Sequence, residues 1–314
     1  MKKYALLSLI CCQFLVASLD TNKEAMKFLV FGGKTGWIGQ MIMEDLSKKG
    51  YACESADSRL ENRESILQEI ESKKPTHIIN AAGVTGNPNV DWCETNKQAT
   101  IRSNIIGALN LADVAFLKKI HMTNFGTGCI YEYNQEHSLR SCIGFTEEDA
   151  PNFAGSFYSS TKIMLDKLLM DYPNVLNLRL RMPISSDLSP RNFITKITKY
   201  PKVINVPNSM TVLDEMIPLA IELAALGEVG NYNFTNPGVI SHNEILELYK
   251  EFVDQDFTWS NFTIEEQDKI LKARRSNNEL DVSKLREKFP QIKEIQDSLI
   301  EVFQKIRAKK NHPS

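Results

Sequence analysis

Short apolar runs alternate with longer amphipathic runs between residues 27 and 181. The longer runs carry apolar residues at helical spacing, as Ile38, Met41 and Ile42 do in the run at 36–49. Helices that connect successive apolar strands in this way cover both faces of a parallel sheet. We therefore predict an α/β fold with a Rossmann-like, doubly wound parallel sheet. The expected strands are 27–31, 51–55, 77–80, 123–126 and 175–181, and the expected helices are 36–49, 63–74, 99–117 and 159–172.

The rhythm changes at about residue 182, where prolines begin to interrupt short segments. These prolines stand at 183, 190, 201, 207, 218 and 237, and polar helices are expected near 242–252 and 297–309. We therefore expect three parts, which are a leader over 1–25, a Rossmann domain over 26–182 and a smaller C-terminal substrate-binding lobe over 183–314.

Composition argues against several classes of function. The chain has 314 residues, and 37 Lys and Arg stand against 39 Asp and Glu, so the net charge is −2. Nucleic-acid binding usually leaves a basic excess, so we expect no nucleic-acid partner. None of the 6 cysteines forms a CxxC pair, and the 5 histidines lack metal-ligand spacing. We therefore expect reduced cysteines and no metal site.

A glycine-rich loop follows the first expected strand. Gly33, Gly36 and Gly39 form a GxxGxxG pattern, with a strand before it and an amphipathic helix after it. This spacing lets the backbone approach a pyrophosphate, which the N–H groups at the helix N-terminus then bind. A structural turn without a ligand is the alternative. The residues expected at the cofactor here are Gly33, Lys34, Thr35, Gly36, Trp37, Ile38 and Gly39.

The end of the second expected strand should select between NADH and NADPH. An acidic residue there binds the free ribose of NADH, whereas an arginine suits the 2′-phosphate of NADPH. Asp57 favours NADH, and Arg59 with Ser58, helped by Lys34, favours NADPH. We predict NADPH and keep NADH as the alternative.

Tyr158 and Lys162 form a YxxxK pattern at the start of an expected helix. Residues four apart share a helix face, and a neighbouring ammonium is expected to lower the pKa of the phenol, so that it transfers a proton near neutral pH. Two solvated helix residues are the alternative. Thr127 follows the fourth strand, where its hydroxyl can bond a substrate carbonyl. The remaining residues expected at the cofactor are Asn80, Ala81 and Ala82, after the third strand, together with Tyr158 and Lys162 themselves.

These features occur in the order and spacing of one family. GxxGxxG, NAAG, the Thr127 hydroxyl and YxxxK resemble the extended short-chain dehydrogenase/reductases. Several longer runs resemble the nucleotide-rhamnose epimerase/reductases, which also form the C-terminal part of bifunctional rhamnose synthases. These runs are GKTGWIG, NAAGVTGNPNVDWCE, TGCIYEY, GSFYSSTK, RMPISSDL, PRNFITKI, FTNPGVISHNEI and RSNNELD. The likeness covers about residues 27–305.

The resemblance implies that a 4-keto-6-deoxy-hexose on UDP or dTDP is epimerised at C3 and C5 and reduced with NADPH to L-rhamnose. By their places in the motifs, Thr127, Tyr158 and Lys162 would carry out the reduction. Cys129 and Lys196 would be the acid/base pair of the epimerisation. The implied substrate-binding residues are Thr85, Asn104, Arg191, Asn192, Arg275 and Asn277. The alternatives are core packing for Cys129, a solvated helix position for Lys196 and a basic loop for Arg275.

Two other functions remain open. A reductase without epimerase activity has no need of Cys129 or Lys196. A non-catalytic regulatory subunit, like the β subunit of methionine adenosyltransferase, has no need of an intact set of Thr127, Tyr158 and Lys162. The expected partner is a nucleotide sugar, a homodimer is the further assembly considered, and no membrane contact is expected.

The N-terminus resembles a secretory signal, because a basic start at Lys2 and Lys3 precedes an apolar run. The run is too short and too interrupted to predict a membrane span. NADPH and nucleotide sugars are cytosolic metabolites, so we expect residues 1–25 to be removed or unused, with Met26 as a working start, in a cytoplasmic protein. Secretory entry, which the sequons at Asn233 and Asn261 would suit, is the alternative.

Overall fold

A six-stranded parallel sheet forms the centre of the chain. The computed structural model describes residues 25–87 and 89–311, so residues 1–24 of the expected leader lie outside it. In spatial order the strands are β2 (Ala52–Ser55), β1 (Lys27–Phe31), β3 (His77–Asn80), β4 (His121–Thr127), β5 (Val175–Leu180) and β7 (Gly230–Asn233). The order reverses between β1 and β3, which is where such sheets bind ligands. The predicted doubly wound α/β fold is confirmed.

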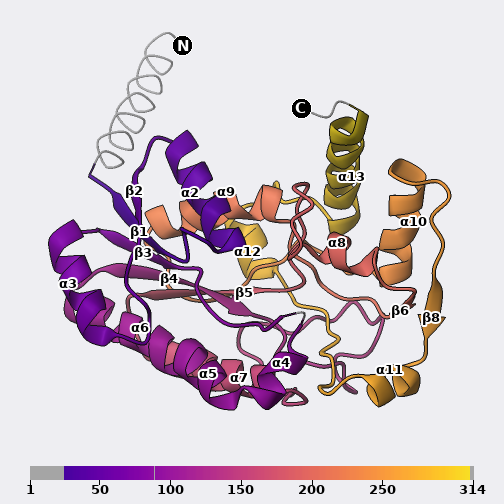
Figure 1. Cartoon of the computed structure of the whole chain (residues 1–314), viewed down its shortest axis with the longest axis horizontal. Helices are drawn as coiled ribbons and strands as arrows, with labels where there is room; N and C mark the ends of the chain where they lie inside the picture. The colour runs from indigo at the N-terminus through magenta and orange to yellow at the C-terminus, as the bar shows by residue number, and fades with distance from the viewer. Residues whose placement is uncertain (1–24, 88, 312–314) are drawn as a thin grey trace, which may run out of the picture.

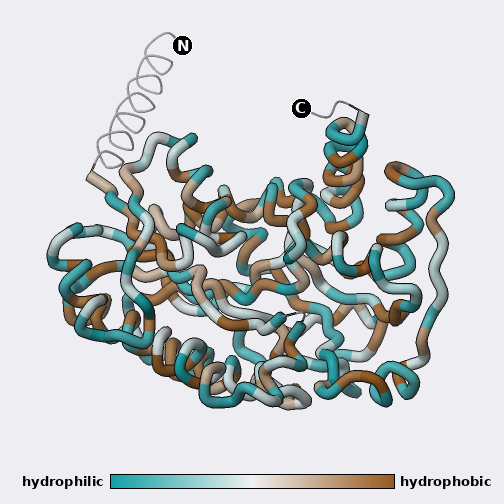
Figure 2. Tube along the Cα trace, in the orientation of Figure 1, coloured by the Kyte–Doolittle hydropathy of each residue, from teal (hydrophilic) through white to brown (hydrophobic). Residues whose placement is uncertain are grey.

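Helices cover both faces of the sheet (Figure 1). Phe28 and Val30 of β1 pack on one face, and Leu29 and Phe31 pack on the other. The first face is covered by α2 (Trp37–Lys48), α9 (Leu213–Ala225) and α12 (Ser283–Lys288), and the second by α3 (Arg63–Lys73), α6 (Ala108–Leu117) and α7 (Phe157–Leu169). Figure 2 shows hydrophobic strands between helices that carry hydrophilic segments on their outer sides. Burial on both faces explains why the strands are apolar runs.

The single helix expected over 99–117 is wrong, because three segments occupy that stretch. They are α5 (Lys97–Ile101), a π-helix η1 (Arg102–Gly107) and α6. The π-helix contains Asn104, whose carboxamide oxygen accepts the N–H of Val84 and whose amide nitrogen donates to the Val84 carbonyl, both at 2.8 Å. Stretches of π-helix are commonly found at functional sites, and here the stretch fixes the loop that follows β3.

The chain returns to the sheet after residue 183. β7 pairs with β5, and α9 and α12 pack against the sheet, so part of the range expected for the lobe belongs with the Rossmann sheet. The boundary at residue 182 stays a prediction. The rest of the range surrounds a two-stranded parallel sheet of β6 (Lys202–Ile204) and β8 (Ser260–Phe262). Its helices are α8 (Phe193–Ile197), α10 (His242–Phe252), α11 (Ile264–Ile270) and α13 (Ile295–Asn311).

A row of buried asparagines crosses four of the strands. Asn80, Asn124, Asn177 and Asn231 are partners in register on β3, β4, β5 and β7. The carboxamide of Asn80 donates to that of Asn124 at 2.9 Å, Asn124 donates to Asn177 at 2.8 Å, and Asn177 donates to Asn231 at 2.8 Å. This asparagine ladder satisfies polar groups in the core and holds neighbouring strands in one register.

Candidate active site

The glycine loop after β1 is built for close backbone approach. Gly32 has a φ of +87°, which few other residues adopt. A Cβ at Gly36 would stand 2.6 Å from the carbonyl oxygen of Gly32, and a Cβ at Gly39 would stand 2.2 Å from it. The glycines therefore let α2 start directly against the strand. Gly36 is the N-cap of α2 and provides no side-chain cap, so N–H groups of the first turn face outward for a phosphate.

The side chains of this loop have separate tasks. Lys34 and Thr35 are exposed, and Ile38 and Met43 belong to the core packing on α2. The Trp37 indole N–H donates to the Asp187 carboxylate, so the first residue of α2 is tied to the segment that enters the lobe. The loop thus fits a dinucleotide pyrophosphate by its backbone, while Trp37 links the loop to the second half of the chain.

The acidic residue at the end of β2 is already paired with two lysines. The Asp57 carboxylate contacts the Lys34 ammonium and lies 3.1 Å from the Lys73 ammonium. These contacts hold the pKa of Asp57 below its usual range, with the hydrogen bond from Lys34 as the largest cause. Arg59 is exposed and has no ion pair within the described residues. The arrangement leaves Arg59 available for a 2′-phosphate and Ser58 beside it.

Tyr158 and Lys162 are buried together near the start of α7. Ser156 caps this helix by accepting the N–H of Ser159 at 2.9 Å, and Glu94 accepts the N–H of Phe157 at 2.6 Å. Thr127 ends β4, where its hydroxyl lies near enough to the phenol of Tyr158 to influence the pKa of that phenol. Residues from two elements therefore meet at the carboxyl edge of the sheet, as expected.

Burial dominates the protonation of this pair. Loss of hydration raises the pKa of Tyr158, although the nearby Thr127 hydroxyl opposes the shift. Burial also lowers the pKa of Lys162 to about 8. The expected lowering of the phenol pKa is therefore wrong for this structure, because burial of the phenol outweighs the other effects. A protonated phenol suits a group that must donate a proton.

The residues after β3 shape the edge of the site. The N–H of Ala82 donates to the carboxamide of Asn80 at 3.2 Å, and Ala81 is half-buried beside the glycine loop. A Cβ at Gly32 would stand 3.0 Å from the backbone of Ala81 and Ala82. This contact brings the loops after β1 and β3 together at the switch point of the sheet.

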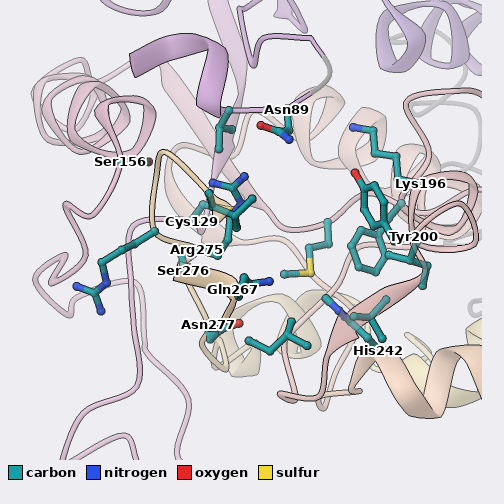
Figure 3. A pocket seen from close by; sticks show the side chains of 18 of the residues that line it. Asn89, Cys129, Ser156, Lys196, Tyr200, His242, Gln267, Arg275, Ser276 and Asn277 are labelled. Atoms are coloured by element: carbon teal, nitrogen blue, oxygen red, sulfur yellow. The ribbon is translucent and has the colours of Figure 1, made fainter. Parts of the chain in front are cut away.

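A cavity of about 570 Å³ opens beside this edge. Cys129 and Arg275 come from one part of its wall, and Lys196, Tyr200 and His242 from another (Figure 3). The predicted residues that line it are Thr85, Cys129, Tyr158, Lys196, Arg275 and Asn277, whereas Thr127, Lys162, Asn104, Arg191 and Asn192 do not line it. A cavity with the Tyr158 phenol in its wall and mostly apolar surroundings is typical of a small-molecule site.

Two groups able to exchange protons line this cavity besides Tyr158. Cys129 is a free, half-buried cysteine two residues past the end of β4. Lys196 lies on α8, where burial lowers the pKa of its ammonium, and the charge of Arg191 acts in the same direction. A lowered pKa brings the amine closer to acid/base work near neutral pH.

The segment 273–278 brings an arginine to the cavity. Nη1 of Arg275 donates to the Asp91 carboxylate at 2.8 Å and to the carbonyl of Ala273 at 2.7 Å. Nε and Nη2 of Arg275 have no hydrogen-bond partner within the described residues. Asn277 accepts a hydrogen bond from the Asn208 carboxamide at 2.9 Å. Arg275 is thus held along one edge and open along the other.

Arg191 and Asn192, like Asn104, are implied substrate ligands that lie outside the cavity. Asn192 is the N-cap of α8, where it accepts the N–H of Ile194 at 3.0 Å and donates to the carbonyl of Ser185. Both atoms of its carboxamide therefore serve the fold. Arg191 is exposed. Their roles toward a substrate stay predictions.

Other cavity residues were not singled out by the sequence. Phe193, Ile197 and Tyr200 line the cavity beside the predicted Lys196, and the spacing of four and seven residues from Phe193 was the helical signal that could have found them. His242 also lines it, and burial lowers the pKa of its ring to about 4. Neither ring nitrogen of His242 has a hydrogen-bond partner within residues 25–87 and 89–311.

Two negative findings, on metal sites and on membrane-spanning helices, concern the residues that the structure describes. No cluster of His, Cys, Asp and Glu there could hold a metal ion. No helix in the same part of the chain combines the length and the apolar character that crossing a bilayer requires.

Comparisons with known proteins agree with the fold and the motifs. Residues 29–199 match the NAD dependent epimerase/dehydratase family. A bifunctional dTDP-4-dehydrorhamnose 3,5-epimerase/dTDP-4-dehydrorhamnose reductase of Arabidopsis thaliana is 55% identical over 89% of this chain and 93% of its own length. A trifunctional UDP-glucose 4,6-dehydratase/3,5-epimerase/reductase of the same plant is 58% identical over 89% of this chain, which spans only 42% of that relative.

Solved structures point to the same group. The UDP-rhamnose synthase of Acanthamoeba polyphaga mimivirus superposes with a TM-score of 0.85 and 42% identity, over 89% of this chain and 99% of the other. A dTDP-4-dehydrorhamnose reductase of Bacillus anthracis in complex with NADP gives a TM-score of 0.75 at 18% identity, over 88% and 97% of the two chains, which supports the fold alone. The chain belongs to the NAD dependent epimerase/dehydratase family, among the extended short-chain dehydrogenase/reductases that include the nucleotide-rhamnose epimerase/reductases.

Proposed function

We propose that the protein is an NADPH-dependent 3,5-epimerase/4-reductase, which converts UDP- or dTDP-4-keto-6-deoxy-D-glucose to the L-rhamnose nucleotide. One observation carries the proposal: Cys129, Lys196 and Tyr158 line the same cavity. A site that only reduced a ketone would need the phenol but not the thiol and the amine. The bifunctional plant relative, a 3,5-epimerase and reductase, supports the same pair of reactions.

The epimerisation half uses the acidity of protons beside the C4 carbonyl. A base removes the proton from C3 or C5, and the electron pair moves onto O4 as an enolate. A second group then returns a proton to the opposite face of the carbon. Cys129 comes from the loop after β4 and Lys196 from α8, on different parts of the cavity wall (Figure 3), so they suit transfer at two faces.

The reduction half uses the groups around Tyr158. Bound NADPH would supply a hydride to C4. The buried phenol of Tyr158 donates its proton to O4, since burial raises its pKa and keeps it protonated. The Lys162 ammonium, which is buried on the same helix, stabilises the phenolate that is left. Thr127 holds the phenol through its hydroxyl.

The NADPH preference rests on the second strand. Asp57, which would otherwise favour the free ribose of NADH, is occupied by Lys34 and Lys73. Arg59 is exposed beside it and suits a 2′-phosphate. Because NADPH and nucleotide sugars are cytosolic metabolites, we place this activity in the cytoplasm.

The test separates the two halves. Protein is incubated with UDP-4-keto-6-deoxyglucose and NADPH in deuterated water, and the product, deuterium at C3 and C5, and NADPH absorbance are followed. Tyr158→Phe should slow NADPH oxidation by about 10²–10⁴-fold while deuterium still enters the keto sugar. Cys129→Ala should abolish exchange at one or both carbons.

Each alternative predicts a different outcome. A wild-type rate of exchange and rhamnose formation in Cys129→Ala would reduce the proposal to a reductase. No NADPH oxidation by wild-type protein with any 4-keto-6-deoxy nucleotide sugar would favour a regulatory subunit instead.

A second copy of the chain is the partner that we propose for the outer face of α6 and α7. Exposed apolar side chains gather on these helices, namely Phe116, Leu117, Met164 and Leu168. Contiguous apolar surface of this kind is characteristic of interfaces. Light scattering should show a dimer that Leu168→Lys with Met164→Lys converts to monomer. A monomeric wild-type protein would refute the assignment.

A further inference from the structure

Three hydroxyl residues follow Tyr158 on α7, and Ser159 differs from the other two because its hydroxyl bonds a segment distant in the sequence. Ser160 donates to the carbonyls of Ser156 and Ala154 at 3.1 and 3.4 Å, and Thr161 donates to the carbonyl of Tyr158 at 2.7 Å. Such bonds to a preceding carbonyl are usual for hydroxyls in helices. Ser159 instead donates to the carbonyl of Cys129 at 2.7 Å, across the gap between α7 and the loop after β4.

The direction of the Ser159 hydroxyl is fixed from behind. Ser156, the N-cap of α7, donates its hydroxyl hydrogen to Oγ of Ser159 at 2.9 Å and accepts the Ser159 N–H at 2.9 Å. Both serines are buried. With one bond accepted from Ser156, the hydrogen of Ser159 is left for Cys129. The two hydroxyls therefore form a short relay that ends on the Cys129 carbonyl.

The backbone N–H and the carbonyl of Cys129 are both hydrogen-bonded to residues that lie beside Tyr158. Its N–H donates to the Thr127 hydroxyl at 3.1 Å, and its carbonyl accepts from Ser159. The Thr127 hydroxyl lies close enough to the Tyr158 phenol to lower its pKa, and Ser159 is the residue next to Tyr158. The preceding carbonyl, of Gly128, is fixed separately by Arg181 and Asn278 at 3.0 Å. The backbone that carries the thiol therefore has little freedom relative to the phenol.

We propose that Ser159 is a positioning residue that keeps the Cys129 thiol in register with the Tyr158 phenol, so that one helix aligns both proton-transfer sites on the same sugar. This inference rests on the proposed function, because it assigns the thiol a part in epimerisation. The chemistry needs such alignment. The enolate forms by proton transfer at carbons next to C4, while the phenol serves O4, so both groups must fit one bound ring.

Ser159→Ala tests the inference, with Ser160→Ala as the matched control one residue further along the helix. Ser160 does not line the cavity and bonds only backbone near the start of α7. Two rates are measured for each variant. One is deuterium entry at C3 and C5 of the UDP-4-keto-6-deoxyglucose, and the other is NADPH oxidation with the already epimerised 4-keto-L-rhamnose nucleotide.

In Ser159→Ala we expect the maximal rate of deuterium entry to fall on the order of 10-fold, the effect of losing one well-placed hydrogen bond. The KM for the keto sugar and the rate of reduction of the epimerised substrate should stay within about 3-fold of wild type. Ser160→Ala should leave both rates unchanged. Ser159→Thr, which keeps a hydroxyl, should recover most of the exchange.

Other outcomes overturn the inference. Equal loss of exchange and reduction in Ser159→Ala, or a variant that does not fold, would give Ser159 a general structural role. Wild-type exchange would leave it no role at all. The proposed function fails separately, when Cys129→Ala exchanges at the wild-type rate. If Cys129→Ala loses exchange and Ser159→Ala does not, only the inference about Ser159 is lost.

Discussion

Asp91 and Arg275 form an ion pair at 2.8 Å that joins the start of α4 (Asp91–Thr95) to the segment after α11. Both side chains are half-buried, Arg275 lines the cavity, and Asp91 also accepts the N–H of Ala273 at 3.3 Å. The pair occupies Nη1 of the guanidinium and leaves its other edge open. An arginine held in this way is prepared to bind a planar set of oxygens with little loss of side-chain entropy.

Arg275→Ala should weaken the binding of UDP about 10- to 100-fold, because a charge-assisted bidentate contact to the diphosphate is lost. Calorimetry with UDP and with uridine measures the effect, and uridine should bind both proteins equally. Arg274→Ala is the matched control, since the neighbouring arginine pairs with Glu132 at 2.9 Å on an exposed site. Equal losses in the two variants would contradict a specific grip by Arg275.

Arg59→Ala should raise the KM for NADPH about 10-fold or more and change the KM for NADH little, because only NADPH carries a 2′-phosphate. Initial rates with each cofactor provide the measurement. Arg63→Ala is a suitable control, because Arg63 is a nearby exposed arginine that already pairs with Asp113. Similar increases for both cofactors in Arg59→Ala would refute the 2′-phosphate assignment.

The reduction rate should decline as the pH rises above about 8, where the Lys162 ammonium loses its proton. Burial lowers this pKa, so the charge that stabilises the phenolate of Tyr158 is present below that pH and absent above it. Stopped-flow NADPH oxidation with the epimerised substrate gives the profile. Lys162→Arg, which stays charged, should remove the decline, and an unchanged profile in that variant would exclude Lys162 as its origin.

Stability should fall as the pH drops below neutrality, partly through His77. Burial, together with the nearby His121, lowers the pKa of His77 to about 4. In the unfolded chain the His77 ring binds a proton near pH 6.5, the usual histidine pKa, whereas in the folded chain it does so only near pH 4. Proton binding therefore favours the unfolded chain as the pH falls, and the free energy of unfolding decreases between about pH 6.5 and pH 4. Thermal midpoints measured across this range should drop less for His77→Phe, which keeps a ring against Phe28. Identical slopes would contradict the assignment.

The sequence predicted those helices and strands in which hydrophobic residues recur with a clear period or form an uninterrupted apolar run. Strands β1 and β3 begin and end where the apolar runs predict, and α10 spans the predicted polar helix. The strand β7 was missed because GNYN has one large apolar residue and relies on pairing with β5 for its conformation. Strands β6 and β8 have three residues each, too few to show alternation.

The residues of the candidate site were also predicted only in part. Motif spacing predicted a role for Tyr158, and the family resemblance implied roles for Cys129, Lys196 and Arg275. The fold brings all four residues to the lining of one cavity. Spacing could not show that Asp91, 184 positions away from Arg275, holds its guanidinium. Nor could it show that burial would reverse the expected pKa shift of Tyr158. Both depend on packing between segments that are distant in the sequence.

The asparagine ladder limits the routes by which this sheet can change during evolution. Asn124 and Asn177 each accept a hydrogen bond from one neighbouring asparagine and donate one to the next. An apolar replacement of either residue therefore leaves polar atoms on the adjacent β-strands without a partner. A buried polar group without a partner costs about 1–3 kcal/mol, a large share of the stability of an ordinary domain. If the asparagines were replaced one at a time, each intermediate protein would contain a destabilised sheet. We therefore expect the four asparagines to be kept or exchanged together.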